Sequence, residues 1–140
     1  MKNARLLLLS FVLMSTAVLN FTGCKKYEDG PRFSLATKKG RITNEWKMTS
    51  SLLNGQPDPY IVLNDVWDIK KDGTYTITST SGYGTTIGSW SFSSDKESIT
   101  VTENGSSDAY IYKILRLKGN ELWLQWQDGS DFFEHHFVAN

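Results

Sequence analysis

Hydrophobic and polar residues alternate in short segments from residue 42 to the end of the chain, with turn residues between the segments. An alternation of period two is typical of half-buried β-strands, because successive side chains of a strand point to opposite faces. Every connection between these segments is too short for a helical crossover, so we expect neighbouring strands to pair antiparallel. The pattern predicts eight strands: 42–53, 62–70, 74–80, 88–93, 98–103, 109–118, 121–126 and 131–138.

The apolar members of this alternation define the face that each strand turns inward. Their neighbours are mostly Thr, Ser, Lys and Glu, which is the composition of a wetted outer surface. In the sixth strand Tyr110, Tyr112 and Ile114 share one parity while Leu115 and Leu117 share the other, which indicates a β-bulge near Ile114. The predicted inward set is Trp46, Met48, Leu52, Leu63, Trp67, Ile69, Tyr75, Ile77, Trp90, Phe92, Ile99, Val101, Leu122, Leu124, Trp126, Phe133, His135 and Phe137.

Eight antiparallel strands with one apolar face close into an up-and-down barrel or fold into two packed sheets. A sandwich usually needs a long crossing connection, whereas the longest gap here, 54–61, is only eight residues. We therefore predict an all-β domain, an eight-stranded antiparallel up-and-down barrel. Asp72-Gly73 and Gly119-Asn120 suit tight hairpins whose central residues have positive φ.

The first 23 residues have the layout of a secretory signal peptide. Lys2 and Arg5 form a positive start, and the run from Leu6 through Leu19 is almost wholly apolar. A permanent membrane span needs about 20 apolar residues, and this core is shorter. The segment is therefore more typical of a signal peptide that is cleaved off than of a permanent transmembrane helix.

The apolar run ends in Phe21-Thr22-Gly23-Cys24, which resembles the lipobox of bacterial lipoproteins. The resemblance implies that Cys24 is acylated and becomes the first mature residue, so that the protein contacts a membrane through this cysteine. It also implies an outer-membrane location, in the periplasmic or the cell-surface leaflet, because Lys25 and not an acidic residue follows the cysteine. The alternative is an ordinary signal peptide with a cysteine near its cut.

The predicted organisation is a lipoprotein signal peptide (1–23), a lipidated cysteine and tether (24–40), and a barrel domain (41–140). The tether is charged and poor in aliphatic residues. Within it, Ser34 is suited to cap a helical turn over 35–39 that Gly40 ends.

Three segments, 41–47 (RITNEWK), 67–75 (WDIKKDGTY) and 88–92 (GSWSF), resemble the lipocalin-like domain of small bacterial lipoproteins over about residues 40–138. Asn44 replaces the glycine of that family's first Gly-x-Trp motif. The resemblance implies a cup that holds a small apolar molecule. Asp65 shares the inward parity and is expected at the open rim or against a ligand headgroup. The other candidate interior residues are Trp46, Trp67, Tyr75, Trp90, Phe92, Trp126, Phe133, His135 and Phe137.

Composition and motifs argue against several other functions. The chain has 15 basic and 15 acidic residues, so no basic excess points to nucleic acid. Cys24 is the sole cysteine, and His135 and His136 point to opposite faces of one strand, so we expect neither a disulfide scaffold nor a metal site. A nucleophile elbow and a phosphate loop are both missing, and we expect no cofactor and no enzymatic activity.

The sequence thus predicts a membrane-anchored lipocalin-like lipoprotein that binds a small hydrophobic or amphipathic ligand without catalysis. The alternative is a solidly packed barrel that acts as a protein-interaction or assembly module of a cell-envelope complex. That alternative requires an exposed apolar patch, for which the candidates are Tyr60, Tyr83, Trp123 and Phe132.

Overall fold

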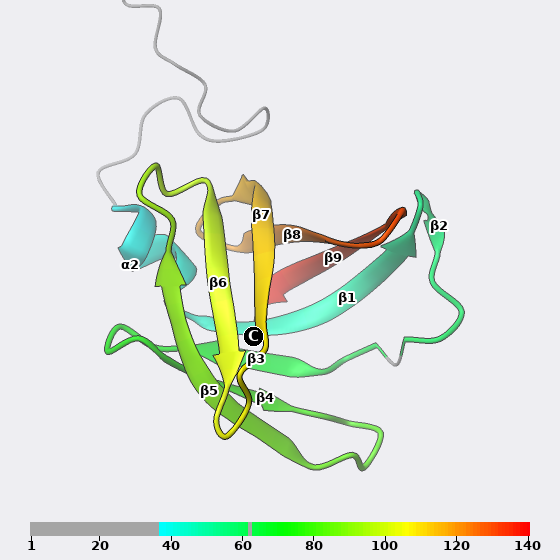
Figure 1. Cartoon of the computed structure of the whole chain (residues 1–140), viewed down its shortest axis with the longest axis horizontal. Helices are drawn as coiled ribbons and strands as arrows, with labels where there is room; N and C mark the ends of the chain where they lie inside the picture. Colours follow the sequence, from blue (N-terminus) through cyan, green and yellow to red (C-terminus); the bar gives the residue numbers. More distant parts are fainter. Residues whose placement is uncertain (1–36, 62) are drawn as a thin grey trace, which may run out of the picture.

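The computed structural model describes residues 37–61 and 63–140 (Figure 1). Cys24, the predicted signal peptide and most of the predicted tether lie outside the described residues. The elements are α2 (Lys38–Ile42), β1 (Glu45–Leu53), β2 (Gln56–Pro57), β3 (Val66–Ile69), β4 (Thr74–Thr78), β5 (Thr85–Phe92), β6 (Ser98–Glu103), β7 (Ala109–Leu117), β8 (Glu121–Asp128) and β9 (Asp131–Ala139).

Strand β1 and strands β3 to β9 form a closed antiparallel barrel. Each of these strands pairs with the next along the chain, and β1 also pairs with β9, for example at Met48 and Phe137. The two-residue strand β2 extends β1 as a short hairpin outside this ring. The predicted eight-stranded up-and-down barrel is therefore confirmed.

The helical turn occurs later in the chain than the sequence predicts, over Lys38–Ile42 in place of 35–39. Its N-cap is Thr37, whose side-chain oxygen accepts a hydrogen bond from the Gly40 N–H at 2.9 Å. Gly40 therefore lies inside the helix. The shift carries Ile42, predicted as the first strand residue, into the core, where its side chain is fully buried.

Several strand limits differ from the predicted ones. Strand β3 begins at Val66, later than predicted, and β2 was not predicted at all. Strand β5 begins at Thr85, because its threonines extend the hairpin with β4 although they lack apolar alternation. Gly73 has the expected positive φ of 92°. The predicted tight hairpin at Gly119-Asn120 also forms, with the Lys118 N–H donating to the Glu121 carbonyl at 2.8 Å, but neither of its central residues has the expected positive φ.

Two β-bulges change which side chains face inward. The register of β7 shifts between Ile114 and Arg116, which confirms the predicted bulge. A second shift lies in β1 between Met48 and Ser50 and was not predicted. It turns Ser51 into the barrel, so the prediction that Leu52 faces inward is wrong.

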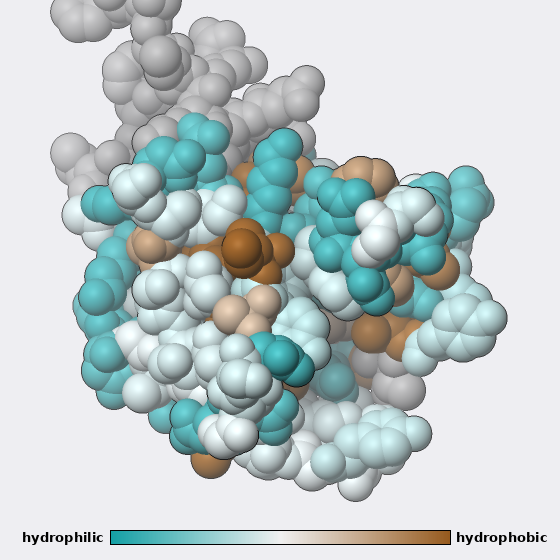
Figure 2. Space-filling view, in the orientation of Figure 1, coloured by the Kyte–Doolittle hydropathy of each residue, from teal (hydrophilic) through white to brown (hydrophobic). Residues whose placement is uncertain are grey.

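The two ends of the barrel differ in how completely their side chains are buried. We call the end next to α2 the sealed end, and the fully buried Ile42, Trp46 and Leu122 lie there. The opposite end, where β1 finishes and β9 begins, is the open end, and its inward-facing Trp126 and Phe133 are only half-buried. Figure 2 shows the surface hollowed between the far end of β1 and the β4–β5 hairpin, with apolar side chains set back in the hollow.

Among the helices of residues 37–140 that the structure describes, none has the length and apolar character needed to cross a bilayer.

Candidate functional site

A polar group lies inside the barrel at its open end. The Ser51 hydroxyl is 3.0 Å from Nδ1 of His135, its register partner on β9, and 3.5 Å from a carboxylate oxygen of Asp58. Both Ser51 and His135 are buried. Asp58 belongs to the β2–β3 connection, which is held in place because its N–H donates to the Ser51 carbonyl at 3.0 Å.

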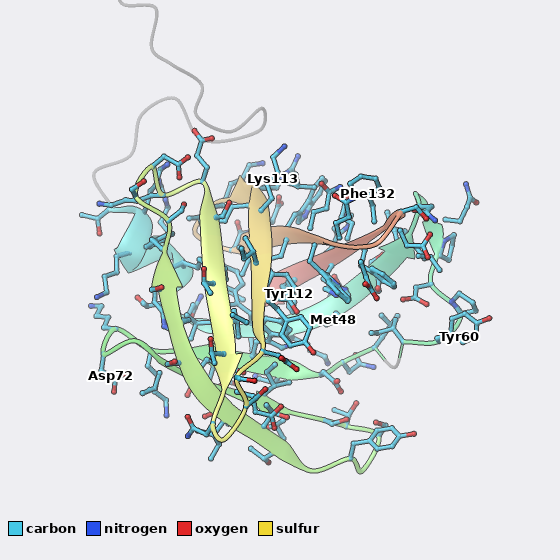
Figure 3. All side chains as sticks on the ribbon, viewed as in Figure 1. Met48, Tyr60, Asp72, Tyr112, Lys113 and Phe132 are labelled. Carbon is cyan, nitrogen blue, oxygen red and sulfur yellow. The ribbon has the colours of Figure 1, made fainter. Side chains whose placement is uncertain are left out.

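Aromatic rings surround this polar group. Tyr112 lies 6.4 Å from the ring of His135 and 5.6 Å from that of Trp67, in an edge-to-face arrangement with the latter. Trp126 stacks on Phe133 at 4.7 Å with an interplanar angle of 18°. Figure 3 shows Tyr112 pointing into the space that the strands enclose. The open end therefore combines apolar ring faces with a few inward polar atoms, which is typical of small-molecule sites.

Two tyrosine hydroxyls reach the same interior without a hydrogen-bond partner among the described residues. They belong to Tyr112, which is 9% exposed, and Tyr75, which is 4% exposed. Burial raises the pKa of both phenols, and the negative charge of Glu103 further raises the pKa of Tyr75. Both hydroxyls are therefore neutral at physiological pH and able to donate or accept a hydrogen bond.

The sequence-predicted aromatic residues divide between the two ends. Trp46, Trp90 and Phe92 lie toward the sealed end, where Trp46 Nε1 donates to the carbonyl of Ile42 at 2.8 Å and Trp90 Nε1 donates to that of Lys70 at 2.9 Å. These indoles are packing residues with satisfied N–H groups. We infer that they fix the barrel and do not line a site.

Three other predicted residues lie between the ends. Trp67 and Phe137 contact each other in the middle of the interior, with ring centroids 5.2 Å apart. Phe137 is fully buried, and the ring of Tyr75 covers Gly88.

Asp65, expected at the rim or against a ligand, is half-buried next to the β4–β5 hairpin. Its carboxylate accepts a hydrogen bond from the Thr80 N–H at 2.9 Å, and its carbonyl accepts one from the Met48 N–H at 2.9 Å. The Asp65 side chain thus fastens the β2–β3 connection to the β4–β5 connection. This geometry accounts for the residue without a ligand contact.

Sequence reasoning missed Ser51, Asp58 and Glu103 as inward or site-forming residues. The Ser51 position depends on the β1 bulge, which leaves no mark in a Thr-Ser-Ser run. Asp58 was assigned to a loop, and only the Asn54-Gly55 turn hints that this loop folds back on β1. Glu103 follows the inward parity of Ile99 and Val101, so the alternation contained the signal for it.

The Asp58, Ser51 and His135 group differs from a nucleophilic triad. In a triad the carboxylate orients the imidazole, whereas here the carboxylate contacts the serine hydroxyl. Within the described residues no three His, Cys, Asp or Glu side chains converge to hold a metal ion. The arrangement is suited to hydrogen bonding.

Burial lowers the pKa of His135 to about 4, although the nearby Asp58 opposes this shift and His136 adds to it. Between pH 6.5 and 4 the unfolded chain binds a proton at this residue and the folded chain does not, so the free energy of unfolding falls as pH falls. We expect this site to remove about 3 kcal/mol across that window. Urea unfolding at pH 7 and pH 4.5 measures it. The His135→Gln variant should lose this part of the pH dependence, and His136→Gln is the control. If the free energy of unfolding changes with pH equally in the parent and in His135→Gln, the result would contradict the burial of a neutral imidazole.

On the outer face, Trp123 is held between two neighbours and is not a free apolar patch. The Arg116 guanidinium lies 3.9 Å over its ring, and the imidazole of His136 stacks on it at 4.1 Å. The exposed aromatic residues of the described chain are instead at the open end: Tyr60 at 87%, Tyr83 at 90%, Tyr110 at 47% and Phe132 at 44%.

No protein-family model matches the chain, and no curated protein matches it. Among solved structures, the chain is similar to the crystal structure of a DUF4847 family protein from Bacteroides vulgatus ATCC 8482. The likeness has a TM-score of 0.50 at 16% sequence identity and covers 71% of this chain and 94% of that chain. At this identity the similarity shows a shared barrel fold.

Proposed function

We propose that the barrel binds a small amphipathic molecule at its open end and does not transform it. The observation that carries this proposal is the contrast between the two ends. The sealed end is packed to complete burial around Trp46, whereas the open end leaves Trp126 and Phe133 half-buried beside the Ser51 and His135 pair. The apolar part of the ligand would contact the rings, and polar atoms of the ligand would meet inward polar groups of the barrel.

We also propose that an acylated Cys24 anchors the protein and that this anchor gives the barrel an orientation. The described chain enters the barrel through Thr37 and α2, at the sealed end, and Cys24 precedes this point by a short segment. A protein held by an acylated Cys24 therefore presents its sealed end to the bilayer and its open end away from it. Lys38, Lys39 and Arg41 lie at the sealed end, where they would face anionic headgroups.

Native mass spectrometry of the protein extracted gently from its own membrane tests ligand binding. We expect a fraction of the protein to retain one bound molecule. An excess of a decyl amphiphile should displace this molecule. Quenching or a blue shift of tryptophan fluorescence during the same titration reports the half-buried Trp126. A barrel that never carries a molecule and whose fluorescence ignores every amphiphile would contradict the proposal.

Replacing Cys24 with Ala tests the anchor. Two or more acyl chains hold a protein on a bilayer stably, because each buried methylene contributes about 0.8 kcal/mol. We expect the variant to move from the membrane fraction to the soluble fraction while its barrel stays folded by circular dichroism. Labelled fatty acid that still enters the Cys24→Ala variant would overturn the anchor assignment.

The second candidate function is a module that docks onto an envelope protein. The exposed Tyr60 and Tyr83 favour it, because two large rings in solvent at one end are unusual for a freely soluble surface. A photo-crosslinking amino acid at position 83 in living cells tests it. A single crosslinked protein, lost when the label is moved to position 119 at the sealed end, supports docking, and no crosslink at position 83 counts against it.

A further inference from the structure

Charge is distributed unequally between the two ends of the barrel. The connections at the open end, with their flanking strand residues, contain five aspartates, Glu103 and neither lysine nor arginine, a net charge of −6. Counted in the same way, the connections and flanking strand residues at the sealed end contain seven basic and five acidic residues, which is 7 − 5 = +2. The open-end aspartates are Asp58, Asp65, Asp108, Asp128 and Asp131. The sealed-end basic residues are Lys38, Lys39, Arg41, Lys70, Lys71, Lys96 and Lys118.

Among these six carboxylates, that of Glu103 belongs to the inward parity of its strand. Glu103 is the last residue of β6 and pairs in register with Gly88, and cross-strand partners share one face of a sheet. Gly88 is buried beneath the ring of Tyr75, so Glu103 shares the inward parity, and its exposed position places it at the rim of the mouth. Burial raises the pKa of the Tyr75 phenol, and the negative charge of Glu103 adds to this shift.

The interior below this acidic mouth contains the hydroxyl groups of Tyr75 and Tyr112. The hydroxyl of Tyr112 is attached to a side chain that is 91% buried, and it has no hydrogen-bond partner among the described residues. The ring of Tyr110 extends the aromatic lining outward, edge-to-face with Trp126 at 5.7 Å. Ring faces, phenol oxygens and carboxylates together attract positive charge and repel anions.

From this arrangement we propose that the ligand is a cationic amphiphile, with an apolar tail among the rings of Trp67, Tyr112 and Phe133 and an ammonium or guanidinium head beneath Glu103. The inference rests on the proposed ligand-binding function and names its chemical class. A fatty acid or an anionic phospholipid would bring its charge against the carboxylates, and the open end offers it no cation. The seven basic side chains that would suit an anion are at the other end of the barrel.

Isothermal titration of the purified full chain with three amphiphiles of one tail length tests the proposal. The probes are decyltrimethylammonium, decyl maltoside and decanoate, each kept below its micelle concentration in low-salt buffer at pH 7.5. We expect the cation to bind about tenfold or more tightly than decanoate, with the uncharged maltoside between them. Added salt should reduce the difference in affinity between decyltrimethylammonium and decanoate, because salt screens charges near the surface.

A pair of isosteric variants locates the effect. Glu103→Gln should weaken decyltrimethylammonium binding several-fold and leave decyl maltoside binding unchanged. Glu97→Gln, in the sealed-end connection that precedes the same strand, is the matched control and should change neither. Equal weakening by both variants would contradict a head-group site at the mouth.

The outcomes separate this inference from the function on which it rests. Equal affinity for the three probes, or tighter binding of decanoate, would leave amphiphile binding intact and overturn the preference for a cation. Binding of none of them would overturn both.

Discussion

Replacing Trp46 with Ala is expected to lower the free energy of unfolding by about 3–5 kcal/mol, a large part of the stability of a domain of this size. The indole is fully buried at the sealed end, and its Nε1 donates to the Ile42 carbonyl at 2.8 Å. The substitution therefore leaves a cavity and a carbonyl without its donor, and it loosens the only described helix of the chain. Urea unfolding followed by circular dichroism measures the loss.

The matched control is Tyr83→Ala, which removes an aromatic ring that is 90% exposed at the open end. We expect the free energy of unfolding of that variant to lie within about 0.5 kcal/mol of the parent value. Similar losses for the two variants, or an unchanged midpoint for Trp46→Ala, would show that the sealed end does not hold the barrel together.

The second large effect is expected at Gly88, where Gly88→Ala should cost about 3 kcal/mol or more. A Cβ at this position would lie 2.1 Å from the Thr102 carbonyl oxygen and 2.5 Å from the nearest atom of the Tyr75 ring. The first of these atoms is backbone of the neighbouring strand, so relief requires the strands to separate or the ring to leave the interior. Thermal unfolding, with near-ultraviolet circular dichroism to follow the tyrosine environment, measures both responses.

Gly119→Ala is the control for this substitution. Gly119 lies in a hairpin connection, has no positive φ, and a Cβ there would meet nothing within 4 Å. We expect its melting temperature to match that of the parent. A Gly88→Ala protein as stable as Gly119→Ala would mean that the Tyr75 ring does not pack on the β5 backbone.

Much of the barrel was predictable because its strands obey one simple rule, burial on alternate residues. The Asp72-Gly73 hairpin was predictable for a local reason, since the Asp72 carboxylate accepts from the N–H and the hydroxyl of Thr74 and glycine allows a φ of 92°. The β1 bulge was not predictable, because it depends on how Met48 and Ser50 align with β9, a strand that follows much later in the sequence.

The candidate site was only partly predictable for the same reason. Alternation placed Trp126, Phe133 and His135 on the inner face, but it carries no information about position along the barrel axis. The position of α2 decides which aromatic residues are packed and which border an opening. This position was hard to predict, because a short helical turn with a Thr37 cap gives a weak sequence signal. The Ser51 and Asp58 contacts arise only after the barrel has closed.

The most direct test of a ligand site at the open end follows the indole N–H signals of the five tryptophans by ¹⁵N NMR while decyltrimethylammonium is added. We expect the signal of Trp126, at the open end, to shift most and the signal of Trp67 to shift next. Trp46 and Trp90, whose N–H groups bond to sealed-end carbonyls, and Trp123 on the outer face should stay in place. Shifts led by Trp46, Trp90 or Trp123, or no shift at any of the five, would contradict a binding site at the open end.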